Sequence, residues 1–204
     1  MLVNFRNPVV IVTKNHLVTR DLDLLTELTR YQAAAVFISI TTLDNDLARR
    51  MEPRASQPEL RFQAIHSLSQ AGVPTGVMVA PVIPGLTDHE LPSIVEKAKL
   101  AGAQSASYVM LRLPFAVKHL FEDWLTTHFP ERKEKILNRI RAIRGGQLND
   151  PQFKTRMKGE GIFAEQIASL FAAACRKAGI SNARPTLSTS SFRRIQENQL
   201  QLFP

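Results

Sequence analysis

The chain has 204 residues, of which 44% are hydrophobic, and this is enough for one packed domain or for one domain with an appendage. No apolar stretch is long enough to span a bilayer and the first residues lack a signal-peptide layout, so we expect a cytoplasmic protein. Cys175 is the only cysteine, which excludes an internal disulfide and a cysteine-rich metal site built from this chain alone, and the five histidines show no metal-ligand spacing.

The net charge of +8 is unevenly placed along the sequence. Residues 1–130 carry 12 Lys and Arg against 12 Asp and Glu, whereas residues 131–204 carry 14 against 6. All of the excess positive charge therefore follows Pro130. This asymmetry suggests a polyanionic partner on one side of the molecule, and a merely basic, solvated surface is the equally weighted alternative.

The first half of the sequence alternates between strand and helix patterns. Leucines at helical spacing predict a helix over 22–28, and Ser56-Gln57-Pro58-Glu59 is a capping-box signature that predicts the start of a second helix. The apolar face expected for that second helix holds Leu60, Ala64, Ile65 and Leu68. A further helical stripe runs from 91 to 101. Short apolar runs predict strands over 9–12, 36–40, 76–80 and 108–111.

The order β-α-β-α-β-α-β predicts an α/β fold, an incomplete (β/α) barrel of four parallel strands over residues 1–114. The strands are apolar at consecutive positions, so we expect them to be buried on both faces. Because a full barrel needs about eight strands and this pattern starts close to Met1, we expect strands to be missing before it.

The character of the sequence changes after Pro114. Residues 115–178 predict a basic extension of three amphipathic helices, in the last of which Cys175 is expected to pack as a small apolar residue. Residues 179–204 are polar and predict a largely flexible tail.

Polar residues follow each predicted strand, at the end of the sheet where parallel α/β folds bind ligands. Hydroxyl groups there suit a ribose, cations suit a carboxylate or phosphate, and Gly85 allows the backbone to approach a ligand closely. No nucleophile–base pair, P-loop or GxGxxG motif is present, and the nearby carboxylates of Asp44, Glu52 and Asp88 lack acid–base spacing, so no catalytic residue is predicted. The segments concerned are Thr13-Lys14-Asn15, Ser39-Ile40-Thr41-Thr42, Pro81-Val82-Ile83-Pro84-Gly85 and Arg112-Leu113-Pro114.

These segments carry a family resemblance. Residues 8–15 (PVVIVTKN), 39–44 (SITTLD), 52–54 (EPR), 80–88 (APVIPGLTD), 111–114 (LRLP) and 155–161 (TRMKGEG) resemble bacterial radical S-adenosylmethionine (SAM) proteins of the spore-photoproduct-lyase-like, or DNA-repair-photolyase-like, group. The resemblance covers nearly the whole chain. It implies a partial (β/α) barrel of six strands, of which the last four would be present here.

The resemblance also implies a SAM site. Lys14 is similar to the residue that holds the SAM carboxylate, and Ser39, or alternatively Thr41, falls where the ribose binds. Residues 81–88 stand where many members have GxIxGxxE, and only two of them fit that pattern. The residues that the resemblance assigns to SAM are Lys14, Ser39, Thr41, Ile83, Gly85, Met110, Leu111 and Arg112.

Members of the family bind a [4Fe–4S] cluster through a CxxxCxxC loop after the first strand, and the cluster reductively cleaves SAM to a radical that abstracts a substrate hydrogen. This loop is absent, so we expect a truncated chain, a split-gene half or a gene-model error, inactive by itself. The alternative is a true cysteine-free relative.

The sequence ends QLQLFP, which resembles the QLxLF pentapeptide with which bacterial replication and repair proteins bind the sliding clamp. The candidate clamp contacts are Gln199, Leu200, Leu202 and Phe203. The alternative is a tail that packs back on its own domain. The basic residues expected to contact nucleic-acid phosphates are Arg132, Lys133, Arg139, Lys154, Arg156 and Lys158.

Three hypotheses follow. The first is a radical SAM enzyme acting on nucleic acid, incomplete as given. The second is a non-catalytic module that binds DNA and the sliding clamp. The third is a plain α/β domain for a phosphate-bearing ligand.

Overall fold

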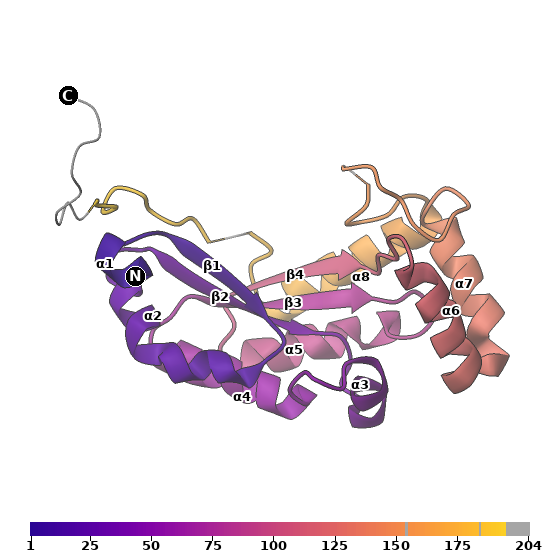
Figure 1. Ribbon diagram of the computed structural model, residues 1–204, viewed down its shortest axis with the longest axis horizontal. Coiled ribbons are helices and arrows are strands. Elements are labelled where there is room, and N and C mark those ends of the chain that lie inside the picture. Colours follow the sequence, from indigo (N-terminus) through magenta and orange to yellow (C-terminus); the bar gives the residue numbers. More distant parts are fainter. Residues whose placement is uncertain (154, 184, 195–204) are drawn as a thin grey trace.

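The computed structural model describes residues 1–153, 155–183 and 185–194. Its sheet has four parallel strands in the order β1-β2-β3-β4 (Figure 1). This confirms the predicted α/β class and the predicted set of parallel strands. The strands are β1 (Val9–Thr13), β2 (Ala34–Ile40), β3 (Thr75–Val82) and β4 (Ser105–Met110).

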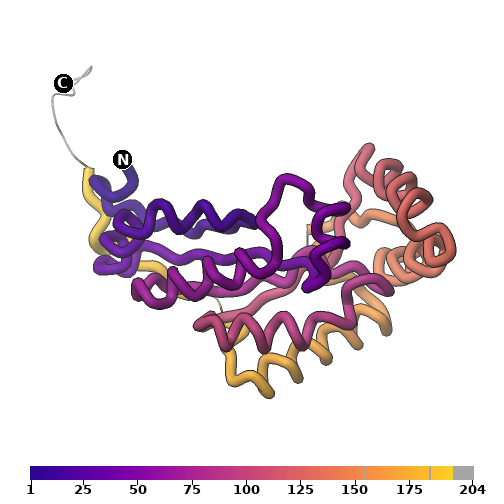
Figure 2. The backbone as a smooth tube through the Cα atoms, turned by 90° about the horizontal axis from the view of Figure 1, so that it is seen from below, coloured from indigo at the N-terminus to yellow at the C-terminus, as the bar shows by residue number. Residues whose placement is uncertain are grey.

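Helices cover one face of the sheet. They are α2 (Leu22–Thr29), α4 (Pro58–Gln70), α5 (Leu91–Leu100) and α8 (Ile162–Ala178), and the last two lie side by side in Figure 2. The main core forms between these helices and the apolar side chains of that sheet face, such as Val36, Ile38 and Val77, each 0% exposed. Cys175 is buried in this core, as predicted.

The other face of β1 lies open. Val10 and Val12 are 49% and 52% exposed, whereas every residue of β2 is buried. The prediction that the strands are buried on both faces is therefore right for β2 and wrong for β1. β1 is one of the two edge strands, and the exposure of Val10 and Val12 shows that its second face is uncovered among the described residues.

A second, smaller core stands beyond the carboxyl ends of β3 and β4. It is built around α6 (Val117–His128) and α7 (Lys133–Ala142), with the short helices η3 (Pro130–Arg132) and α3 (Asn45–Met51) beside them (Figure 1). The buried residues of α7 share one helix face, as expected for an amphipathic helix. The central apolar residues of this core are Ile83, Leu113, Leu125, Ile136, Leu137 and Ile140.

Helix α4 differs from its prediction at two points. Ser56 does not cap the helix; the N-cap is Gln57, and the Ser56 hydroxyl donates to Asn15 and accepts from the His16 N–H. Leu60 is 40% exposed, while Arg61 is only 1% exposed. The buried face therefore holds Pro58 and Arg61 in place of Leu60, and the interior beside Arg61 is polar.

The amino ends of the strands are joined by a segment that follows α8. Ser181 forms a parallel bridge with Ser105 of β4, the Ser188 N–H donates to the carbonyl of Gln32, and the Arg193 N–H donates to the carbonyl of Phe5 in α1 (Leu2–Phe5). The connections around the sheet also include η1 (His16–Asp21) and η2 (Asp88–Glu90). Among the described residues, no helix has the length and apolarity needed to cross a membrane.

Candidate functional site

Three of the predicted residues meet at the carboxyl ends of β1 and β2. Lys14 forms an ion pair with Glu52 Oε1, and its ammonium lies 3.4 Å from Thr41 Oγ1. Thr41 Oγ1 is 2.7 Å from Glu52 Oε1 and 2.8 Å from the carbonyl oxygen of Ala80, and its single proton serves one of them at a time. The Ser39 hydroxyl donates to the same Ala80 oxygen across 2.9 Å.

Arg61 supports this network from below. Its Nη2 lies 2.6 Å from Glu52 Oε2, its Nη1 donates to the carbonyl of Ser39 at 2.9 Å, and its Nε donates to the carbonyl of Ser56 at 2.7 Å. The guanidinium thus ties α4 to the end of β2 and to the segment after α3. A buried charge needs such pairing and hydrogen bonding to be tolerated.

The Glu52 carboxylate is held in its charged form. Burial alone raises the pKa of Glu52, but the Lys14 ammonium, the Thr41 hydroxyl and Arg61 together more than offset burial, so the pKa lies below its ordinary value. The side chain of Glu52 is 10% exposed and that of Lys14 is 35% exposed. The Glu52 carboxylate is therefore charged, and its ion pair with Lys14 is accessible from one side.

That side is a cavity of about 360 Å³, lined by Lys14, Asn15, Glu52, Pro53, Arg54 and Ala55. It places an ammonium and a carboxylate next to each other at the carboxyl rim of the sheet. This arrangement complements a ligand that carries both a carboxylate and an ammonium, which are the two charged groups of an α-amino acid. We call it the Lys14–Glu52 cavity.

The other residues assigned to SAM lie elsewhere. The side chains of Ile83 and Met110 are 0% exposed and that of Leu111 is buried, so all three belong to the apolar cores. Gly85 lies against α7, where a Cβ would come 2.9 Å from Arg139 Cδ. Arg112 follows β4, and its buried Nε has no hydrogen-bond partner among the residues that the structure describes.

The comparisons with known proteins bear on the segment that holds the Lys14–Glu52 cavity. The family model of the Radical SAM superfamily matches residues 3–98, which include Lys14, Ser39, Thr41 and Glu52. This part of the chain is similar to the radical SAM superfamily.

The chain is also similar to curated proteins without an assigned function. It is 30% identical over 168 residues to an uncharacterized protein of Mycobacterium tuberculosis, which covers 81% of this chain and 46% of the relative. An uncharacterized protein of Methanocaldococcus jannaschii is 27% identical over 137 residues, covering 67% of this chain and 50% of the relative. The chain thus spans about half the length of the curated relatives it matches.

Solved structures show the same fold. A spore photoproduct lyase complexed with dinucleoside spore photoproduct superposes with a TM-score of 0.57 at 14% identity, covering 83% of this chain and 48% of that one. A double mutant of spore photoproduct lyase with bound AdoMet and the same dinucleoside has a TM-score of 0.52 at 16% identity, covering 83% and 48%. This confirms the spore-photoproduct-lyase-like fold that the sequence predicted.

Glu52 and Arg61 were absent from the predicted SAM site. The sequence does hold a signal for Arg61, because it shares the 3, 4 and 7 spacing of a buried helix face with Ala64, Ile65 and Leu68. A cation on that face requires a buried anion nearby, and Glu52 is the anion that the fold supplies.

The basic residues predicted to contact nucleic acid separate into two groups. Arg132 and Arg139 face the β3–α5 loop, where Arg132 donates to the carbonyl of Gly85 at 2.6 Å and Arg139 lies 3.6 Å from Asp88. Lys133 instead donates to Thr126 on α6 at 2.8 Å.

The remaining basic residues follow α7. Arg156 lies over the ring of Phe153, with 4.5 Å from Cζ to the ring centroid. The Lys158 ammonium lies 3.4 Å from the ring centroid of Tyr108 and donates to the Tyr108 carbonyl at 3.1 Å. Lys154 lies outside the described residues, and so do the tail residues of the clamp motif, Gln199, Leu200, Leu202 and Phe203. The clamp contact stays a prediction.

The residues of this chain do not fit a [4Fe–4S] cluster. Such clusters are held by several cysteine thiolates, and the chain has one cysteine. Burial raises the pKa of the Cys175 thiol, which disfavours even this one thiolate. Within residues 1–153, 155–183 and 185–194, no group of three or more His, Cys, Asp or Glu side chains could hold a metal ion.

Proposed function

We propose that this chain binds SAM in the Lys14–Glu52 cavity and contributes that site to a radical SAM enzyme acting on nucleic acid. One observation carries the SAM part: an ionised Lys14–Glu52 pair lines a cavity of about 360 Å³ at the carboxyl rim, within the segment that matches the superfamily. Lys14 suits the SAM carboxylate and Glu52 suits its ammonium. The hydroxyls of Ser39 and Thr41 are buried and bond to the Ala80 carbonyl, so they support the pair from within and do not line the cavity.

Each of these residues has a separate part in the proposal. Arg61 fixes the Glu52 carboxylate from the buried side, so that the other carboxylate oxygen meets Lys14 at the cavity wall. SAM supplies the adenosyl group from which a radical is formed on one-electron reduction. The cluster that delivers this electron needs thiolates that these 204 residues do not include, so the reaction requires them from polypeptide beyond this sequence.

SAM affinity measured by equilibrium dialysis tests the cofactor part. Lys14→Met removes the cation at nearly constant side-chain volume, and we expect SAM affinity to fall about tenfold or more, since a hydrogen bond to a charged group contributes about 1.5–3 kcal/mol. Lys97→Met removes the same charge from the exposed side of α5 and should leave affinity unchanged. Equal affinity of both variants would reject the site.

The nucleic-acid part is supported by the basic second half of the chain, which carries 14 Lys and Arg against 6 Asp and Glu after Pro130. It is also supported by the dinucleoside bound to a lyase of similar fold. DNA affinity should fall linearly with the logarithm of salt concentration, and salt-insensitive binding would reject this part. Salt-sensitive DNA binding without SAM binding would favour the alternative, a non-catalytic DNA-binding module.

A further inference from the structure

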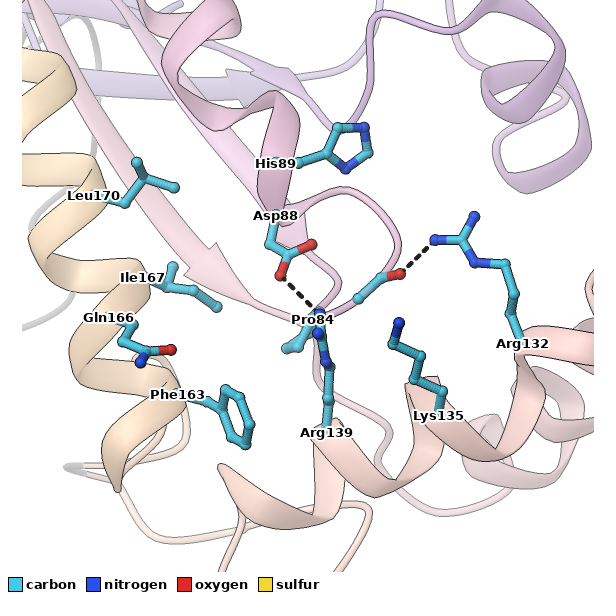
Figure 3. Close-up of a pocket in the computed structure, with 11 residues that line it drawn as sticks. Pro84, Asp88, His89, Arg132, Lys135, Arg139, Phe163, Gln166, Ile167 and Leu170 are labelled. Carbon is cyan, nitrogen blue, oxygen red and sulfur yellow. Dashed lines mark hydrogen bonds and ion pairs between the residues drawn. The ribbon is translucent and has the colours of Figure 1, made fainter.

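A second cavity lies between the β3–α5 loop, α7 and α8 (Figure 3). Its volume is about 450 Å³, and none of its lining residues belongs to the Lys14–Glu52 cavity. The residues that matter below are Gly85, Arg132, Lys135, Arg139, Phe163 and Gln166. We call it the α7–α8 cavity.

Three cations point from one side of this cavity. Arg132, Lys135 and Arg139 are spaced three and four residues apart, from the N-cap of α7 to its last turn, so they lie along one face and all reach toward the β3–α5 loop (Figure 3). Like charges at this spacing repel one another. The three cations of this cavity therefore repel one another, and a bound anion would offset this repulsion.

Protein partners neutralise this charge only in part. Arg139 lies 3.6 Å from Asp88, and Arg132 donates to the Gly85 carbonyl, which is uncharged. Lys135 is exposed and has neither an ion-pair nor a hydrogen-bond partner among the residues described. Lys135 and the remaining donors of Arg132 are thus available to an anion, and a guanidinium beside an ammonium suits a phosphate.

The opposite wall, contributed by α8, is apolar with one amide. Phe163 and Leu170 are exposed in spite of their size, Ile167 is buried beside them, and Gln166 offers an amide (Figure 3). The Arg139 guanidinium lies 5.7 Å from the Phe163 ring centroid. An aromatic face next to clustered cations suits a base that is linked to a phosphate.

We propose that the α7–α8 cavity is a nucleotide seat, which places one phosphate against Arg132 and Lys135 and one base against Phe163. The seat deepens the nucleic-acid part of the proposed function, on which it rests, and it does not depend on SAM binding. The same chemistry is offered by a nucleotide within a single DNA strand and by a free mononucleotide, and the experiment separates the two.

The test uses fluorescence anisotropy of a labelled short oligothymidylate, together with calorimetry of dTMP. Arg132→Gln/Lys135→Gln should lower affinity about tenfold or more and reduce the slope of log affinity against log salt by about 0.7, since one single-strand phosphate contact contributes about that amount. Lys118→Gln/Arg141→Gln makes the same charge change on exposed Lys118 and on Arg141, neither of which lines the cavity. This control pair should change affinity less than twofold, as a generic charge effect would.

The base contact has its own pair of variants. Phe163→Ala should weaken binding about tenfold, because stacking of a base on an aromatic ring contributes about 1–3 kcal/mol. Ile162→Ala changes an exposed neighbour in the same helical turn, outside the cavity, and should have no effect.

The pattern across the two ligands identifies the source of the nucleotide. If the cavity variants bind the oligonucleotide more weakly than wild type does, the cavity accepts a nucleotide within a strand. If only their affinity for dTMP falls, it accepts a free nucleotide. If neither ligand distinguishes the cavity variants from their controls, the seat is rejected. If the wild-type protein binds dTMP but no oligonucleotide, the nucleic-acid function is rejected, whereas the nucleotide site is retained.

Discussion

Arg61 Nη2 lies 2.6 Å from Glu52 Oε2, and this buried contact joins α4 to the rim of the sheet. Its position explains why Lys14 is held at the mouth of a cavity. Lys14 is tied to one oxygen of a carboxylate whose other oxygen is anchored in the interior.

Removal of Arg61 should destabilise the fold strongly. Arg61→Met leaves Glu52 Oε2 and two backbone carbonyls without their donor, and we expect the free energy of unfolding to fall by about 3–5 kcal/mol. Urea denaturation followed by circular dichroism measures this. Arg49→Met removes an exposed i,i+3 partner of Asp46 and should cost at most about 1 kcal/mol. Similar losses in the two variants would contradict the buried network.

The lowered pKa of Glu52 gives a signed pH dependence. A carboxyl whose pKa is lower in the folded than in the unfolded state stabilises the fold above its unfolded pKa, near 4.5, and that stabilisation is lost as pH falls through the folded pKa. We expect wild-type stability to drop below about pH 4.5. Glu52→Gln should flatten this drop, while Glu59→Gln, on the exposed side of α4, should retain it. Parallel acid curves for wild type and Glu52→Gln would oppose this assignment.

Substitution of Gly85 and of Gly72 by Ala separates backbone strain from a steric clash with a neighbouring side chain. Both have positive φ, 84° and 76°, but a Cβ at Gly85 meets Arg139 Cδ at 2.9 Å, whereas a Cβ at Gly72 has no atom within 4 Å. Both Ala variants should lose about 1–2 kcal/mol from the backbone conformation. Only Gly85→Ala should also weaken nucleotide binding, by displacing Arg139. If both variants bind the nucleotide equally well, the close packing of Arg139 against Gly85 is not required for nucleotide binding.

The strands were predictable because their β-branched runs are local signals that a parallel sheet uses directly. The polar ends of β1 and β2 also met as expected, since parallel strands present the same ends together. The open face of β1 was not predictable, because an edge strand has the same apolar sequence as a central one.

The misplaced features depend on contacts far apart in sequence. Ser56 was expected to cap α4 but bonds to Asn15 and His16, about forty residues earlier. Gly85 was expected near Lys14 but faces Arg139, on a helix whose docking no local pattern specifies. Arg61 was overlooked because hydrophobic periodicity does not count a cation as a core residue.

Calorimetric binding of two ligands, one with and one without the amino-acid group, tests the SAM site most directly. SAM carries a carboxylate and an ammonium on a sulfonium, whereas 5′-methylthioadenosine has the same adenosine on a neutral thioether without either group; the comparison of Lys14→Met with wild type for each ligand cancels the difference at sulfur. Lys14→Met should lower SAM affinity about tenfold and leave methylthioadenosine affinity within about twofold. A variant that binds both ligands as tightly as wild type, or that weakens both equally, would contradict the assignment of the Lys14–Glu52 cavity to SAM.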